Sequence, residues 1–431
     1  MPLMSTAPEH APRLSGAGPG NSTGSPSLPF APSVTGGRRK SVRVAIGFCV
    51  LALSIVISCG EKPPAPAPKS DRGLSYFNER VRSVPWSVHV VQVERGEPTL
   101  GLQTMLARRT VLGLGTVSEQ AASVPASWGL PVAAVNGDFY QRENSSYAGD
   151  PRGLQIVNGE LVSAPGEQAA FWLDADGQPH ATNVMSRFRV SVPGGKSYPL
   201  GLNEERTGRE CVLYTPTLGK ATRNRGGAEW ILERNGSGPW LPLRIGENYS
   251  GKVREIRKGS STPLAPDIVV LAVGANLASN VVEVGSLVEF STETLPSLKG
   301  ATVAIGGGSI VTLDGKRARI EAPNGMRGGY SVSSMYERHP RAMMGWSKTH
   351  FFLAEVDGRQ RGLSAGMTLE EVGAYMAKLG CDTALSLDGG GSATMWYAGK
   401  VVNSPCDGVE RPVANSLIVV RKEKAKAAAS P

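Results

Sequence analysis

Residues 384–420, ALSLDGGGSATMWYAGKVVNSPCDGVERPVANSLIVV, hold the densest group of chemically reactive side chains in the sequence. Two short apolar segments, 384–387 and 416–420, are expected to be β-strands on either side of a polar stretch. Three glycines directly follow Asp388, and residues without a Cβ allow both φ > 0 and a close approach to the main chain. The pattern predicts a loop that presents N–H groups and a carboxylate to a ligand; a plain turn is the structural alternative.

Further polar motifs precede this stretch in a defined order. They are AAVNGDFY (133–140), RGLQIVNGELVS (152–163), VAIGGGSIVTLDGK (303–316), ERHPRAMMGWS (337–347) and VDGRQRGLSAGMTLEEVGAYMAKLG (356–380). Together with LSLDGGGSATM and KVVNSPCDGVERPVAN, they resemble the signature of the phosphodiester glycosidase family over about residues 88–420. Ala342 and Ser386 stand where that family usually has Thr and Asn, which leaves fine specificity open.

The resemblance implies a hydrolase, a phosphodiester glycosidase that cleaves a carbohydrate phosphodiester at the sugar-1-phosphate bond. Such a reaction needs an activated water or a stabilised cation at the anomeric carbon, and neutralisation of the departing phosphate. The expected catalytic carboxylates are Asp388, Glu410 and Asp138, with Asp407 as a further carboxylate. The expected substrate- and phosphate-binding residues are Asn136, Gly307, Gly308, Arg341, Arg359, Gly389, Gly390, Gly391, Ser392, Arg411 and Asn415.

The residues leave several alternatives open. Asn136-Gly137 is equally a hairpin-turn signal, and a lone histidine such as His339 is more often structural than a proton shuttle. No cofactor is certain and the metal is unknown, but a divalent metal that bridges phosphate and carboxylates is not excluded by the sequence. The alternative function is a non-catalytic envelope lipoprotein that binds an anionic glycan. Carboxylates beside a phosphate cradle would repel such a ligand, which favours the enzyme.

The strand and helix patterns predict a β-rich α+β fold with few helices. We expect one catalytic domain over residues 87–421, because the motifs of a single site come from both ends of that span, and a disordered tail over 422–431. Residues 87–94, SVHVVQVE, alternate apolar and polar side chains and predict a strand with one solvent-exposed face. Helices are predicted over 117–128 and 368–379; in the second, Thr368 is the expected N-cap and Glu371 completes a capping box.

The amino-terminal residues predict export rather than a folded domain. Residues 1–37 are rich in Pro, Ser and Gly and are expected to be disordered or untranslated. Residues 38–59 combine a basic start with a short apolar run that ends at Cys59, as in a lipoprotein-type signal segment. An uncleaved anchor and an ordinary signal peptide are the alternatives. Residues 60–86 then form a Pro-rich tether, so we expect an exported bacterial lipoprotein, lipid-anchored in the cell envelope through Cys59, with a role in exopolysaccharide or envelope glycan metabolism.

Charge and cysteine content bound the class of partner. The net charge is +9, and residues 1–58 contribute +4 of it (five Lys or Arg against Glu9). The remaining +5 suits an anionic substrate or envelope polymer, but no cluster of basic and aromatic side chains indicates nucleic-acid binding. Beyond the export segment, the cysteines are Cys211, Cys381 and Cys406. At most one disulfide is therefore expected. A structural zinc site is not expected, because the sequence has no CxxC motif and no Cys/His pairs at ligand spacing. The oligomeric state is not predicted.

Overall fold

The structure, a computed structural model, describes residues 69–142, 144–166, 168–207, 210–237, 240–259, 261–278, 282–320 and 332–423. They lie in one compact unit, Pro63–Pro431. Its described α-helices are α1 (Val117–Ala122), α2 (Ala275–Ala278), α3 (Val332–Tyr336) and α4 (Leu369–Lys378), and none of them is long and apolar enough to cross a bilayer. The predicted β-rich fold with few helices is confirmed. The predictions for residues 1–59, Cys59 included, and for the tail beyond 423 lie outside the described residues.

An eight-stranded antiparallel sheet contains both the first strands and several motif strands. In spatial order its members are β1 (Lys69–Asp71), β2 (Leu74–Val81), β3 (Trp86–Glu94), β23 (His350–Val356), β22 (Arg341–Trp346), β24 (Thr383–Ser386), β20 (Ile310–Leu313) and β21 (Lys316–Arg317). β1 and β2 fall inside the predicted tether of residues 60–86. The tether prediction was therefore too long, because β2 pairs with β3 along its whole length and Leu74 enters the core.

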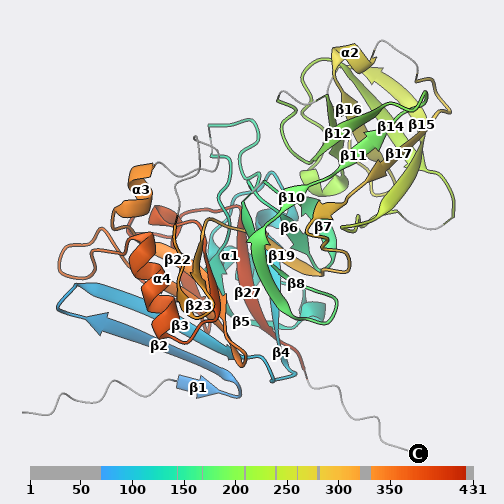
Figure 1. Cartoon of the computed structure of the whole chain (residues 1–431). Helices are drawn as coiled ribbons and strands as arrows, with labels where there is room; N and C mark the ends of the chain where they lie inside the picture. Colours follow the sequence, from blue (N-terminus) through green and yellow to red (C-terminus); the bar gives the residue numbers. More distant parts are fainter. Residues whose placement is uncertain are drawn as a thin grey trace, which may run out of the picture. The chain divides into compact units, whose positions relative to one another are not determined.

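Both faces of this sheet are covered. Val88 and Val90 of β3 pack with Leu369 and Val372 of α4, whereas Val91 on the opposite face belongs to a core shared with other sheets. The expectation of a solvent-exposed face on residues 87–94 was wrong, since polar side chains on that face are buried as well. Figure 1 shows α4 lying along one side of the sheet strands β22 and β23.

Two five-stranded sheets cover the second face. One has the order β26 (Lys400–Val401), β25 (Met395–Tyr397), β5 (Leu130–Asn136), β27 (Asn415–Arg421) and β4 (Leu100–Leu106). The other has the order β7 (Glu160–Ser163), β6 (Gln155–Val157), β19 (Val303–Gly306), β8 (Ala169–Leu173) and β9 (Pro179–Asn183). β27 lies between β5 and β4 and pairs with both (Figure 1). This pairing places Asn415 beside the end of β5.

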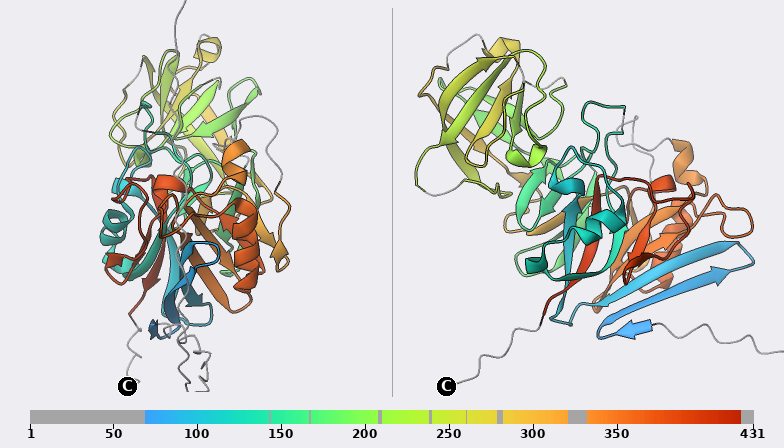
Figure 2. Two further views of the ribbon diagram at one scale, coloured as in Figure 1. Left: turned by 90° about the vertical axis from the view of Figure 1, so that its left-hand side faces the viewer. Right: turned by 180° about the vertical axis from the view of Figure 1, so that it is seen from behind.

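The middle of the chain forms a closed barrel. Its strands, in order around the barrel, are β11 (Arg189–Ser191), β12 (Ser197–Leu202), β13 (Cys211–Tyr214), β16 (Val269–Val273), β14 (Ala228–Arg234), β15 (Asn248–Lys258) and β17 (Leu287–Ser291). A two-stranded sheet pairs β10 (Met185–Ser186) with β18 (Thr294–Leu295), and 3₁₀ turns lie at Ala107–Arg109, Ala126–Trp128, Pro216–Leu218 and Gly390–Ser392. Figure 2 shows the barrel strands, coloured green to yellow, grouped together. Cys211, Cys381 and Cys406 are free thiols.

Candidate active site

The Asp388 loop leaves β24 and is fastened to the end of β5. The Asp388 N–H donates to the Gly137 carbonyl over 2.9 Å, and the side-chain amide of Asn136 donates to the Asp388 carbonyl over 2.7 Å. The Asn136 side-chain oxygen also accepts from the Thr394 N–H at 3.0 Å. The predicted grouping of Asn136 with Asp388 is therefore present in the structure. Because Asn136 is fully buried, it holds the loop in place and does not face a ligand.

Asp138 lies beneath this loop and is only 1% exposed. Its carboxylate accepts from the N–H groups of Phe139 and Gly153, each over 2.7 Å, and its own N–H donates to the Asn415 side chain over 2.8 Å. Burial raises the pKa of Asp138 to about 8, although these two N–H donors act in the opposite direction. A Cβ added at Gly306 would overlap the carboxylate. Asp138 was predicted as a catalytic residue and Asn415 as a substrate-binding residue. In the structure they join the end of β5, the start of β27 and the segment at Gly153 behind the Asp388 loop.

Like Glu410, and unlike the buried Asp138, Asp388 is a partly accessible carboxylate. Burial raises its pKa to about 6, while the Ser392 hydroxyl, the Gly389 N–H and the charge of Arg411 lower it. The Gly389 N–H donates to Asp388 Oδ1 over 2.9 Å. With a pKa of about 6, Asp388 is mainly ionised at neutral pH. A general base or a carboxylate that stabilises a developing cation requires this protonation state.

Arg359 lies directly over Gly390. Gly390 has φ +62°, and a Cβ added there would lie 3.3 Å from a terminal nitrogen of the Arg359 guanidinium, so glycine serves both the conformation and the close approach. The Arg359 guanidinium donates to Nδ1 of His339 from Nε at 3.3 Å and lies 3.2 Å from it at Nη2. Burial, followed by Arg341 and Arg359, lowers the pKa of His339. His339 is therefore neutral at physiological pH and orients Arg359.

Arg411 lies over the next glycine of the loop. A Cβ added at Gly391 would overlap both the Arg411 guanidinium and the Asp407 carboxylate. Arg411 donates to Asp407 Oδ2 from Nη2 over 2.6 Å and from Nε over 3.1 Å. Both partners are about one-third exposed. The structure thus brings together Asp388, the glycines 389–391, Ser392, Arg359 and Arg411, as the sequence predicted.

The second glycine triplet is not a phosphate cradle. The Gly307 N–H donates to the Ala169 carbonyl over 3.0 Å, and the Gly308 N–H donates to the Ser386 carbonyl over 2.8 Å. Both glycines are buried, and a Cβ at Gly307 would lie 2.7 Å from the Ser386 carbonyl oxygen. The predicted binding role of Gly307 and Gly308 is corrected on this evidence, because their donors are used by neighbouring strands. Glycine here allows β19 to pack closely against β24.

Arg341 also differs from its prediction. It is 4% exposed, and its guanidinium donates to the main-chain carbonyls of Met367, Ser334 and Glu337 over 2.9, 2.5 and 2.9 Å respectively. A guanidinium held by three carbonyls orders the segments that carry them. We therefore assign Arg341 to holding residues 334–341 in place, and Arg359 takes over its predicted role.

Glu410 stabilises the start of a helix. Its carboxylate accepts from the Ser118 N–H over 3.1 Å and from the Ser118 hydroxyl. Ser118 is in the first turn of α1, where N–H groups lack partners within the helix and a negative charge is favourable. The structure therefore shows Glu410 capping α1, and its predicted catalytic role stays a prediction.

Three polar residues elsewhere in the eight-stranded sheet were not predicted as site residues. They are His89, Glu355 and Asp357, which come together in the core. The available signal was a single glutamate within the apolar strand sequence HFFLAEV. A separate pocket of about 250 Å³ is lined by Met105, Arg109, Trp128, Asn158, Glu160 and Thr217 among others, and none of the predicted site residues lines it.

Comparisons with known proteins give a fold and a family match to part of the chain. A hypothetical protein from Synechocystis has a TM-score of 0.65 at 18% identity, covering 81% of this chain and 62% of its own. A protein from Burkholderia pseudomallei K96243 has a TM-score of 0.59 at 22% identity, covering 78% of this chain and 74% of its own. At these identities the likenesses establish the fold alone.

Sequence comparison covers shorter stretches. The SPbeta prophage-derived uncharacterized protein YomE of Bacillus subtilis (strain 168) is 36% identical over 83 residues, which are 19% of this chain and 13% of that protein. Residues 255–420 match the family described as phosphodiester glycosidase. The motifs at 133–163 lie before the matched residues, whereas the Asp388 loop, Arg359 and Arg411 lie within them. This match confirms, over residues 255–420, the resemblance to the phosphodiester glycosidase family that the ordered motifs predicted.

Proposed function

We propose that this protein is a hydrolase that cleaves sugar-1-phosphodiesters at the Asp388 loop. The observation that carries the proposal is the approach of two guanidinium groups, from Arg359 and Arg411, to consecutive glycines beside a carboxylate that is ionised at neutral pH. Planar guanidinium groups suit the oxygens of a phosphodiester. The family match over residues 255–420 agrees with this chemistry.

Each group has a distinct role in the proposed reaction. Arg359 and Arg411 bind the phosphodiester and neutralise the charge that develops on the departing phosphomonoester. Asp388 either activates the attacking water or stabilises positive charge at the anomeric carbon. A phosphomonoester is a good leaving group, so the reaction does not depend on a strong general acid. Substrate phosphate would compete with Asp407 for Arg411, which makes the Asp407–Arg411 pair the first contact to rearrange.

The test is a hydrolysis assay on the full chain, purified in detergent, with a panel of sugar-1-phosphodiesters and the matching phosphomonoesters. We expect release of free sugar from the diesters and loss of at least about a hundredfold in kcat for Asp388→Asn. Asp176→Asn, which changes an exposed turn residue, is the matched control and should leave turnover unchanged. Saturable binding without any turnover would instead establish the alternative function, a lipoprotein that binds an anionic glycan.

We propose further that the protein acts outside the cytoplasm as a lipoprotein, on an exopolysaccharide or another envelope glycan. The support is the basic and apolar sequence of residues 38–58 before Cys59. Cys59→Ala should abolish processing at this position and release the protein from the membrane fraction. Unchanged processing together with unchanged membrane retention would contradict the proposal.

A further inference from the structure

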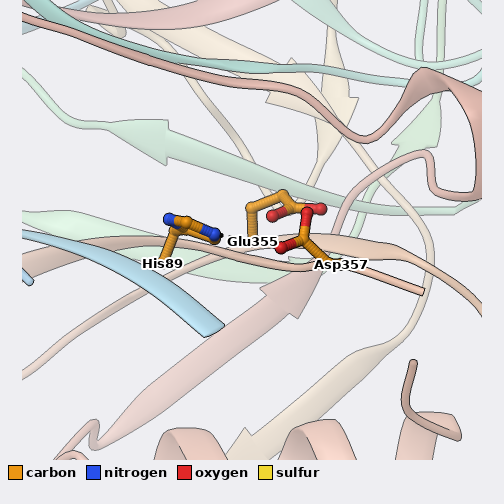
Figure 3. Close-up of side chains that lie close together, drawn as sticks. All are labelled: His89, Glu355 and Asp357. Carbon is orange, nitrogen blue, oxygen red and sulfur yellow. Dashed lines mark hydrogen bonds and ion pairs between the residues drawn. The ribbon is translucent and has the colours of Figure 1, made fainter. Parts of the chain in front are cut away.

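Three polar side chains converge inside the core between the eight-stranded sheet and its covering sheets. His89 of β3 is paired directly with Glu355 of β23, and directly opposed residues in an antiparallel pair place their side chains on the same face. Asp357 follows Glu355 by two residues, so it returns to that face. Figure 3 shows the carboxylates of Glu355 and Asp357 side by side, with the His89 ring directed toward them. The sheet register therefore creates the cluster.

These side chains are buried to an extent that is unusual for charged groups. Glu355 is 0% exposed, Asp357 1% and His89 5%. Within the part of the chain that the structure describes, neither carboxylate oxygen of Glu355 has a hydrogen-bond partner within normal geometric limits. The Asn403 side-chain amide, which has two N–H groups, donates to the Ala393 carbonyl and also lies near Glu355, where it opposes the rise in the pKa of that carboxyl that burial causes. A buried carboxylate without donors is strongly unfavourable, which implies that a positive charge or a proton compensates it.

The spacing of the polar atoms fits a cation. His89 Nε2 lies 3.1 Å from Asp357 Oδ2, and neighbouring ligands at roughly 2.1 Å from a zinc ion lie about 3.0–3.4 Å apart in tetrahedral or octahedral geometry. One ligand atom from each residue lies within 4.8 Å of the others. Among the described residues, the Glu355 oxygens have no hydrogen-bond partner that would oppose a rotation toward the other two ligands.

The surroundings orient the ligands as they do around known metal sites. The Tyr76 hydroxyl is 2.8 Å from His89 Nδ1, so Nδ1–H can donate to the phenol oxygen. The Asn78 side-chain amide and the Ser87 hydroxyl lie 3.2 and 3.4 Å from Nε2, and a metal bound at Nε2 would replace these contacts. Asp357 Oδ1 accepts from the Ser404 N–H over 2.7 Å, which leaves Oδ2 for the cluster.

We propose that His89, Glu355 and Asp357 bind one divalent transition-metal ion, Zn²⁺ or Mn²⁺, as a structural site. Two carboxylates and a neutral imidazole carry a charge of −2, which the ion balances. The mixed nitrogen and oxygen ligands favour these ions over Mg²⁺ and Ca²⁺, which prefer oxygen alone. This inference does not rest on the proposed hydrolytic function, because its evidence is the buried, unpartnered Glu355 and the ligand spacing.

The site would fix the segment that carries Arg359. Asp357 is followed by Gly358, where a Cβ would lie 2.5 Å from the Pro340 nitrogen, and then by Arg359 at φ +59°. An ion bound at Asp357 would hold the start of this tightly packed turn. Metal loss is therefore expected to disturb the position of Arg359 as well as the stability of the fold.

The test combines metal analysis with thermal unfolding of the full chain, expressed with Zn²⁺ and Mn²⁺ and purified in detergent without chelator. We expect about one ion per wild-type chain by mass spectrometry and none in Glu355→Gln or Asp357→Asn. The surface pair His180 and Asp174, 2.8 Å apart and exposed, provides His180→Ala as the matched control, which should keep the ion. Removal of the ion by a chelator should lower the wild-type Tm by roughly 5 °C, and the addition of Zn²⁺ or Mn²⁺ should restore it.

The Glu355→Gln variant separates the metal from a proton. If a proton compensates Glu355, the neutral glutamine has nearly the same shape and should leave Tm unchanged or raised, and chelator should have no effect on either protein. That result would overturn the proposal, as would equal metal content in wild type and both cluster variants, or stripped wild-type protein whose Tm does not respond to either ion. All of these readouts are independent of catalytic activity.

Discussion

Replacing Asp388 with Asn should abolish turnover and at the same time stabilise the folded protein at pH 8. Burial raises the pKa of Asp388 from 3.8 to about 6, so the folded state binds this proton more tightly than the unfolded state does. The ionised carboxylate therefore destabilises the fold; this cost is fully present above pH 6 and disappears below pH 3.8. A shift of about two pKa units corresponds to about 3 kcal/mol, and partial exposure of the side chain reduces this to about 1–2 kcal/mol.

The assay is urea unfolding of wild type and Asp388→Asn at pH 8 and at pH 4. The variant should be more stable by about 1–2 kcal/mol at pH 8 and should lose most of that advantage at pH 4. In wild type, kcat/KM should rise about tenfold between pH 5 and pH 7 as Asp388 ionises with a pKa of about 6. The variant should lack both the activity and its pH dependence.

Asp407→Asn is the matched control, because the pKa of Asp407 is shifted in the opposite direction to the pKa of Asp388. Burial acts to raise the pKa of Asp407, but the hydrogen bonds and charge of Arg411 outweigh it and the pKa is lowered. Its ionised form therefore stabilises the fold above the unfolded pKa, and the variant should be no more stable than wild type at pH 8. The reasoning fails if Asp388→Asn is less stable than wild type at pH 8, or if it retains wild-type kcat.

Three further substitutions test the site assignments. Gly391→Ala should lower kcat/KM by about tenfold or more, because its methyl group would displace Arg411; unchanged kinetics would exclude close contact. Glu410→Gln should cost about 1 kcal/mol in urea unfolding through the weakened contact with Ser118 and leave kcat intact, whereas a large loss of kcat would support its predicted catalytic role. Arg359→Lys should mainly raise KM in steady-state kinetics, since a point charge replaces a two-pronged donor; a change in kcat alone would argue against phosphate binding.

Local patterns predicted those parts of the fold that depend on near neighbours in sequence. Helix α4 forms with Thr368 as N-cap and Glu371 completing the capping box, as expected, because both interactions lie within one turn. The helix predicted over 117–128 ends at Ala122 instead, since Pro125 interrupts it before the 3₁₀ turn Ala126–Trp128. The closed barrel was not predicted, because closure depends on which distant strands pair and each strand alone resembles any half-buried strand.

The site was predictable where the chemistry depends on a contiguous motif. Asp388, its glycines and Arg411 lie within one short stretch and meet in the structure. The contacts of Arg341 and Glu410 were not predicted because their partners, the carbonyls near Met367 and the start of α1, are distant in sequence. His89 was read as part of an exposed face, since alternation alone cannot show that a second sheet covers the polar side chains.

The central position of β27 in its sheet has a consequence for how the protein is made. Asn415, at the start of this strand, bonds to Asp138 across 277 residues of sequence, and β27 separates β4 from β5. While the ribosome is still translating the barrel, β4 and β5 have no partner between them, and the support of the Asp388 loop is absent. The nascent chain therefore lacks the central strand of this sheet until β27 is synthesised. A product truncated before residue 415 would expose two unpaired strand edges to proteases and chaperones.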